Sequence, residues 1–198
     1  MRTPIRLFLF ISLAFWALPA LGKEARWSEI SGVGVQRGQP VAIRLRIDAV
    51  PGDGEILLLF KDVVYGSDFQ LSIDRADQWV RAFHPGLLDK LNLVVSIHHD
   101  FHGAIFLEGD SLGAALAVAM LAAVDGRKII PDVLITGTLQ SDGTLGKVTY
   151  IREKAEMAAT LKAKILLVPS GQKIDWPGLR TIDIKSLPAA LPFILQPP

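Results

Sequence analysis

The 198-residue chain contains no cysteine. This absence excludes disulfide bonds and a thiol nucleophile, so the fold has to be held together by packing alone. A hydrophobic content of 50% provides enough material for a sizeable core. The sequence also has no internal repeat, no low-complexity segment and no G-x-x-x-x-G-K-[ST] phosphate-binding loop.

Histidine is scarce, and its placement excludes one common catalytic arrangement. The segment Gly109-Asp110-Ser111-Leu112-Gly113 matches the G-x-S-x-G nucleophile elbow, in which the histidine of the triad follows the serine along the chain. Here every histidine precedes Ser111, which argues against an α/β-hydrolase. The four histidines are His84, His98, His99 and His102.

Two other motifs are weak. His98-His99-Asp100-Phe101-His102 contains the usual zinc-ligand types, but its spacing suits a helix better than the strand end and loop expected there. We therefore interpret it as a polar loop beside the active site. Gly32-Val33-Gly34 with Gly38 lacks both the dinucleotide-binding spacing and the helix that should follow, so we expect a turn.

Residues 1–22 have the features of a secretory signal peptide. Arg2 and Arg6 precede an uncharged apolar run, residues 7–21, and Ala20-Leu21-Gly22 is a small-x-small cleavage pattern. The run is shorter than the roughly 20 residues that a membrane-spanning helix needs. We expect cleavage and export to the periplasm or the medium. The alternative is a protein anchored to the membrane by residues 7–21.

The expected mature chain, residues 23–198, has the length of one domain. Loss of two arginines leaves 19 basic against 20 acidic side chains, a net charge of −1. This balance does not indicate nucleic-acid binding.

Hydrophobic periodicity predicts an α+β domain that mixes hairpin and crossover units. Residues 41–50 and 56–60 read as two strands joined by a turn at 51–54, which predicts a hairpin. The other predicted strands are 91–98, 104–107, 133–139, 165–168 and 181–184. The predicted helices are 71–84, the apolar run after Ser111, 151–161 and a short one from Leu187.

The helix after Ser111 organises the other elements. Mostly small apolar residues run from Leu112 to Val124, and Gly126 provides a left-handed stop. Asp110 or Ser111 can cap the first turn. The free N–H groups of that turn would then surround Ser111 and favour an oxyanion formed when the serine attacks a carbonyl.

A serine without a usable histidine directs attention to lysine as its base. Helical spacing puts Lys154 on the same face as Ile151, Ala155 and Ala158. Lys154 could lie at the edge of this apolar face and extend to solvent. A buried lysine would instead bind its proton less tightly and could act as a base toward serine.

These segments resemble the proteolytic domain of Lon proteases, which use a Ser-Lys dyad. Glu108-Gly109-Asp110-Ser111 is similar to the nucleophile motif of the archaeal-type branch. Residues 131–137 resemble the strand that carries a supporting threonine, here Thr136, and residues 152–155 resemble the segment with the catalytic lysine. The intervals of 25 and 43 residues from Ser111 to Thr136 and Lys154 match the family spacing. The resemblance covers roughly residues 50–170.

The resemblance implies a ribosomal-protein-like α+β fold, hydrolysis of peptide bonds without a cofactor, and ring-shaped homo-oligomers. It implies that Ser111 is the nucleophile, that Lys154 is the general base and that Thr136 hydrogen-bonds the lysine amine. Asp110 and Glu108 would tune the lysine or gate the site; their alternatives are a helix cap and a solvated loop acid.

The sequence also departs from the family. Thr138 stands where many members have glutamate, and Thr149-Tyr150 stands where a Gly-Gly pair usually enters the lysine helix. Lon proteases carry an AAA+ ATPase, whereas this chain lacks the phosphate loop. We therefore expect ATP-independent cleavage of unfolded or peptide substrates, unless a partner supplies unfolding. A rival hypothesis is a non-catalytic binding or assembly module of the cell envelope, and an esterase or amidase is a third.

Overall fold

The computed structural model describes residues 26–36 and 39–197. The predicted signal peptide, residues 1–22, and Gly38 of the predicted glycine turn lie outside the described residues. No helix of the described part is both long and apolar enough to cross a membrane.

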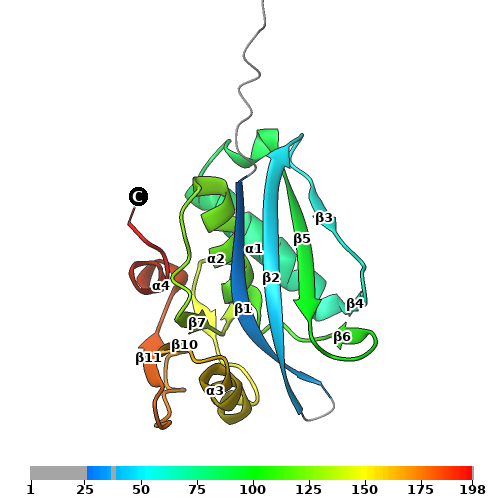
Figure 1. Cartoon of the computed structure of the whole chain (residues 1–198). Coiled ribbons are helices and arrows are strands. Elements are labelled where there is room, and N and C mark those ends of the chain that lie inside the picture. Colours follow the sequence, from blue (N-terminus) through cyan, green and yellow to red (C-terminus); the bar gives the residue numbers. More distant parts are fainter. Residues whose placement is uncertain (1–25, 37–38, 198) are drawn as a thin grey trace, which may run out of the picture.

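A four-stranded sheet forms one side of the domain, in the order β1-β2-β5-β3 (Figure 1). The pair β1–β2 and the pair β2–β5 are antiparallel, whereas β3 pairs with β5 in parallel. Along β2 the apolar side chains alternate with Arg44, Arg46 and Asp48, so one face of the sheet is buried and the other meets solvent. The strands are β1 (Arg26–Gln36), β2 (Gln39–Pro51), β3 (Ile56–Leu58) and β5 (Leu91–His99).

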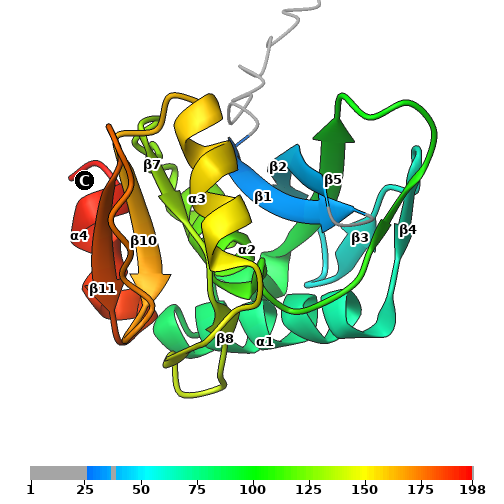
Figure 2. The ribbon, with the colours of Figure 1, turned by 90° about the horizontal axis from the view of Figure 1, so that it is seen from below.

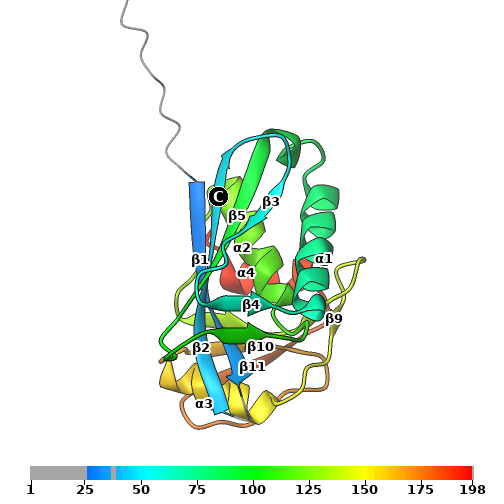
Figure 3. The same ribbon diagram turned by 90° about the vertical axis from the view of Figure 1, so that its right-hand side faces the viewer.

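The helix α2 (Gly113–Asp125) packs on the buried face of this sheet, and α1 (Ser67–Phe83) packs against α2. Figure 3 shows both helices on the same side of the sheet. Every residue of α2 from Gly113 to Val124 is buried, because the helix is apolar on all sides and has α1 on one flank and β1 and β2 on another. As predicted, α2 ends at Gly126, whose φ is 68°.

The remaining elements extend the domain beside α2. A parallel sheet in the order β11-β10-β7 packs against α4, and α3 lies across the ends of β1 and β2 (Figure 2). The pairs β4–β6 and β8–β9 are short ribbons. The bounds are β4 (Val63–Tyr65), η1 (Leu88–Lys90), β6 (Ile105–Leu107), β7 (Val133–Ile135), β8 (Thr138–Leu139), β9 (Leu145–Gly146), α3 (Ile151–Thr160), β10 (Ile165–Pro169), β11 (Arg180–Ile184) and α4 (Leu187–Ile194).

The α+β class is confirmed, but the predicted hairpin and the predicted glycine turn are wrong. The predicted hairpin between residues 41–50 and 56–60 does not form, since β2 pairs with β1 and β5 while β3 lies beyond β5. The predicted turn at Gly32–Gly34 lies within β1. Gly32 suits this strand because a Cβ there would come within 2.9 Å of Leu112 and 3.2 Å of Ile43, so glycine allows close packing rather than a turn.

The predicted strand 133–139 is divided into β7 and β8. Between them Thr136 N–H donates to Leu167 O, whereas Gly137 N–H donates to Ser111 O, at 3.0 Å in both cases. The backbone thus leaves the parallel sheet and binds the segment before α2. This break follows from long-range hydrogen bonding, which the apolar character of the segment cannot reveal.

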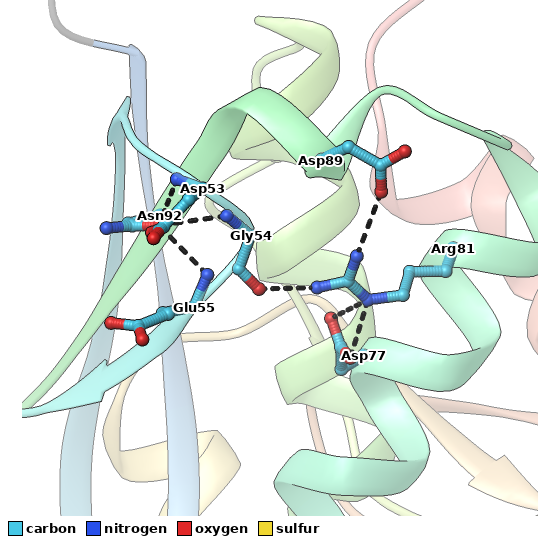
Figure 4. A network of polar contacts seen from close by, with 7 residues as sticks. All are labelled: Asp53, Gly54, Glu55, Asp77, Arg81, Asp89 and Asn92. Atoms are coloured by element: carbon cyan, nitrogen blue, oxygen red, sulfur yellow. Dashed lines mark hydrogen bonds and ion pairs between the residues drawn. The ribbon is translucent and has the colours of Figure 1, made fainter.

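A polar network fixes the crossover from β2 to β3 (Figure 4). Asn92 Oδ1 accepts the N–H groups of Asp53, Gly54 and Glu55 at 3.0, 3.1 and 2.9 Å. Arg81 on α1 donates to Gly54 O and to the Asp77 carboxylate. One amide oxygen therefore satisfies three main-chain donors, and the same turn is tied to α1.

We expect Asn92→Ala to lower the free energy of unfolding by about 1–2 kcal/mol, because three donors lose their shared acceptor but can be partly rehydrated. Urea denaturation measures the change. Asn92→Asp is the matched control, since it keeps an accepting oxygen and should lose less. An equal loss in both variants would contradict the acceptor role.

Candidate active site

Three segments that are distant in sequence meet at the amine of Lys154. Ser111 lies in the turn that precedes α2, and Lys154 lies in the first turn of α3. Lys154 Nζ is 3.0 Å from Ser111 Oγ and 2.9 Å from the main-chain oxygen of Val33 on β1. The two residues expected to act together are therefore in hydrogen-bonding contact.

The amine of Lys154 is buried. The residue is 3% exposed, and its helix neighbours Ala155 and Ala158 are fully buried. The alternative of a lysine that extends to solvent is therefore wrong. Burial lowers the pKa of Lys154 to about 8, in the predicted direction. At pH 7 about one molecule in ten then has a neutral amine, compared with about one in 2,500 for an ordinary lysine.

The carbonyl of Val33 is a site group that the sequence analysis missed. β1 is the edge strand of its sheet, so main-chain groups on its outer side lack a neighbouring strand. Lys154 Nζ fills part of this edge by bonding Val33 O. A carbonyl oxygen carries no side-chain signal, so only correct assignment of β1 as an edge strand beside α3 could have identified it.

Thr136 contacts the serine segment rather than the lysine. Its Oγ1 donates to the main-chain oxygen of Ser111 at 3.2 Å, and Gly137 N–H donates to the same oxygen at 3.0 Å. Ala114 N–H donates in return to Gly137 O at 3.1 Å. The expected bond from Thr136 to the lysine amine is thus replaced by one that anchors the main chain of Ser111.

The start of α2 differs from the expected cap. The helix begins after Leu112, and neither Asp110 nor Ser111 caps it through a side chain. The N–H groups of Gly113 and Ala114 donate to Asp110 O and Gly137 O, so these first-turn donors are already used. Within the described residues, the N–H groups of Asp110 and Ser111 have no protein acceptor.

Both acidic side chains lie against α1. Asp110 is 3.7 Å from Arg75 of α1. The carboxylate of Glu108 packs against Gly66, at the N-terminal end of α1, where any Cβ would collide with it. Neither acid is a hydrogen-bond partner of Lys154, whose lowered pKa results from burial.

Ser111 and Lys154 line a cavity of about 200 Å³ between β1, β6 and the start of α3. Buried apolar side chains, among them Ile43, Phe69 and Ile105, form its floor, and exposed Phe106 and Tyr150 form its rim. No histidine lines it. The described residues also contain no group of three or more potential metal ligands, so the zinc alternative at His98–His102 has no support in the described structure.

Tyr150 has an unusual main-chain conformation directly before α3. Its φ of 57° and ψ of 41° fall in the left-handed region, which favours glycine. Its main-chain oxygen nevertheless accepts the N–H of Lys154 at 3.0 Å and so begins the helix. The entry to α3 therefore has the geometry of a glycine position although tyrosine occupies it.

Residues 48–186 match the model of the Lon protease (S16) C-terminal proteolytic domain. The chain belongs to this family. The match extends over β5, α2, β7 and α3, so it includes Ser111, Thr136 and Lys154.

Individual relatives agree with this assignment. A Lon protease of Desulforamulus reducens is 34% identical over 77 residues, which are 39% of this chain and 10% of that protein. An archaeal Lon protease of Methanocaldococcus jannaschii is 29% identical over 93 residues, 46% of this chain and 14% of that protein. A Lon protease of Phenylobacterium zucineum is 22% identical over 162 residues, which are 80% of this chain and 19% of that protein. The chain thus spans a minor part of each relative's length.

The buried lysine should make stability depend on pH. The folded protein releases the Lys154 proton near pH 8, whereas the unfolded chain keeps it to about pH 10.5. The unfolded state therefore binds more protons between these values, and stability rises with pH there. We expect the free energy of unfolding to increase by about 2 kcal/mol from pH 7.5 to 9.5.

Urea denaturation at several pH values measures this increase. Lys154→Met is the control, because it retains an apolar chain of similar length but has no proton to release. Parallel pH dependence in the wild type and in Lys154→Met would show that the lysine pKa is not depressed.

Proposed function

We propose that the protein is a serine peptidase that hydrolyses peptide bonds through a Ser111–Lys154 dyad. The observation that carries this proposal is the 3.0 Å contact between Ser111 Oγ and the buried Lys154 amine. A lysine with a pKa of about 8 can accept a proton at neutral pH. Membership of the Lon proteolytic-domain family supports the same activity.

In the proposed mechanism, neutral Lys154 accepts the hydroxyl proton of Ser111 while Oγ attacks the scissile carbonyl carbon. The carbonyl π electrons move to oxygen and form the tetrahedral oxyanion. The N–H groups of Asp110 and Ser111, which have no protein acceptor in the described residues, are its donors. Val33 O stabilises the lysine ammonium.

Collapse of this intermediate breaks the C–N bond. The ammonium of Lys154 then returns its proton to the leaving amine, and an ester to Ser111 remains. Water attacks the ester with Lys154 again as the base, and Ser111 Oγ leaves with the proton. In this mechanism Thr136 and Gly137 hold the main chain of Ser111 still during both steps, through their bonds to its carbonyl.

The size of the cavity supports substrates that are already unfolded or short. About 200 Å³ is less than a typical small-molecule site and has room for one side chain with its backbone. We also propose that the cleavage is independent of ATP and takes place outside the cytoplasm. The proposed assembly is a ring-shaped homo-oligomer. The sequence features of residues 1–22 support export.

A non-catalytic binding or assembly module remains the rival class. The charge on a buried lysine opposes folding at neutral pH, by about 3 kcal/mol for the lowered pKa. A module without catalysis gains nothing from this cost, so the buried lysine favours the enzyme. An esterase or amidase would use the same dyad, and comparison of ester and peptide substrates distinguishes it.

Ser111→Ala should reduce hydrolysis of unfolded casein by at least about 1,000-fold, because the nucleophile is removed while a smaller side chain is accommodated. Intact mass after incubation with a fluorophosphonate should show one adduct on the wild type and none on the variant. Ser141→Ala, in an exposed turn, is the matched control and should behave as the wild type does. Activity of Ser111→Ala close to that of the wild type would exclude the dyad.

Lys154→Arg should be inactive although it keeps the charge, because guanidinium stays protonated. For the wild type, kcat/KM should rise with pH through one ionisation near the lowered pKa of Lys154, about 8. Lys173→Arg, at an exposed position outside the cavity, is the control for the substitution. The variants His98→Ala, His99→Ala and His102→Ala should keep the rise. If one histidine variant lost the rise of kcat/KM with pH while Lys154→Arg stayed active, the base would be that histidine.

A further inference from the structure

Tyr150 has a strained backbone that the contacts of the fold do not explain. The residue before a helix usually has extended backbone, whereas Tyr150 is left-handed with a φ of 57°. A side chain with a Cβ is disfavoured in this region, and glycine is not. Strain of this kind persists where another requirement determines the residue.

The other left-handed residues with side chains have local explanations. Within the described part of the chain they are Asp62 and Lys162. Aspartate tolerates this conformation through its short polar side chain. Lys162 follows the last turn of α3, where helices often end in a left-handed residue. Tyr150 stands at the beginning of α3, where no such rule applies.

The ring of Tyr150 contributes little to the described fold. It is 56% exposed, and its hydroxyl has no hydrogen-bond partner among the described residues. The protein's other tyrosine is a contrast: Tyr65 is buried, stacks on Phe69 and donates its hydroxyl to Leu59 O. The requirement that keeps an aromatic side chain at position 150 therefore lies outside the packing of the domain.

The position of Tyr150 indicates what that requirement is. Its side chain borders the cavity that contains Ser111 and Lys154, on the side of α3. Phe106, on β6, is the other large exposed aromatic residue at this cavity. Because Ile105 N–H and Leu107 O bond toward β4, the main-chain groups of Phe106 point to the opposite side of β6. Exposed aromatic residues from two different elements, β6 and the start of α3, thus line the same cavity.

We infer that Tyr150 is a specificity-determining residue whose ring contacts an extended polypeptide as it lies across the Ser111–Lys154 site. This inference rests on the proposed function, because it assigns a substrate contact at the proposed catalytic cleft. Phe106, on β6, lines the same cavity and is a second aromatic residue available to the bound chain. A flat ring provides a large contact area with little loss of side-chain entropy. This contact is the requirement for which the protein retains a strained backbone at Tyr150.

Tyr150→Gly tests the inference because stability and substrate binding should change in opposite directions. Relief of the left-handed strain should raise Tm by about 1–3 °C. Loss of the ring should raise KM for a quenched casein-derived peptide by about five- to tenfold, with most of the effect on KM and not on kcat. Tyr150→Phe should restore the wild-type KM, since the ring and not the hydroxyl makes the contact.

Lys162→Gly is the matched control. It replaces another left-handed residue at the far end of the same helix, and the side chain of Lys162 does not border the cavity. It should raise Tm and leave KM unchanged. Fluorescence anisotropy of labelled casein in a Ser111→Ala background gives a second readout without turnover, in which Tyr150→Gly should weaken binding by the same factor.

An unchanged KM and unchanged casein affinity in Tyr150→Gly would overturn the inference and leave the dyad intact. A lower Tm together with a loss confined to kcat would also overturn it, because that pattern belongs to a structural role at the start of α3. A wild-type protein that neither cleaves casein nor reacts with a fluorophosphonate at Ser111 would overturn the proposed function and this inference together.

Discussion

The desolvated amine of Lys154 is the constraint on which the rest of the site depends. A lysine with 3% exposure and two polar contacts, Val33 O and Ser111 Oγ, has lost most of its hydration. Both of its protonation states need these contacts, because an amine without a partner in the interior would be costly. The two segments that supply these contacts, β1 with Val33 and the turn with Ser111, must therefore stay within hydrogen-bonding distance of Lys154 Nζ.

The edge position of β1 and the small residues around it make this arrangement possible. An interior strand would use its carbonyl groups in the sheet, whereas the outer side of an edge strand leaves Val33 O free to accept from an amine. Gly32 lets Leu112, directly after Ser111, pack against β1. The small side chains of Ala155 and Ala158 let α3 approach β1 and β2 closely enough to enclose the aliphatic part of Lys154. Larger residues at these positions would move the amine away from the serine.

The sequence predicted the elements with strong local signals. The apolar run of α2 with its stop at Gly126, the spacing of α3 and the strands β5, β10 and β11 all depend on periodicity, which is local. The intervals among Ser111, Thr136 and Lys154 identified the residues that the fold brings together. The class of fold, and the pairing of Ser111 with Lys154 that the structure shows as a direct contact, were therefore accessible without coordinates.

The sequence-based predictions failed where main-chain groups form hydrogen bonds with residues that are distant in sequence. The pairing of β2 with β1, the separation of β7 from β8 and the acceptor role of Val33 O each depend on backbone groups, which are alike at every residue. The expected bond from Thr136 to the lysine was wrong for the same reason, because the Thr136 hydroxyl donates to the main-chain carbonyl of Ser111 instead.

The main-chain contact of Lys154 also suggests how a lysine base can work without the acid that orients a histidine base. A histidine base requires a third group to select its tautomer and direction. A lysine amine has three equivalent positions and no tautomers, so burial and one fixed carbonyl are enough to aim its lone pair at the serine. In the proposed dyad the second support therefore lies on the proposed nucleophile, Ser111, whose carbonyl accepts hydrogen bonds from Thr136 and Gly137.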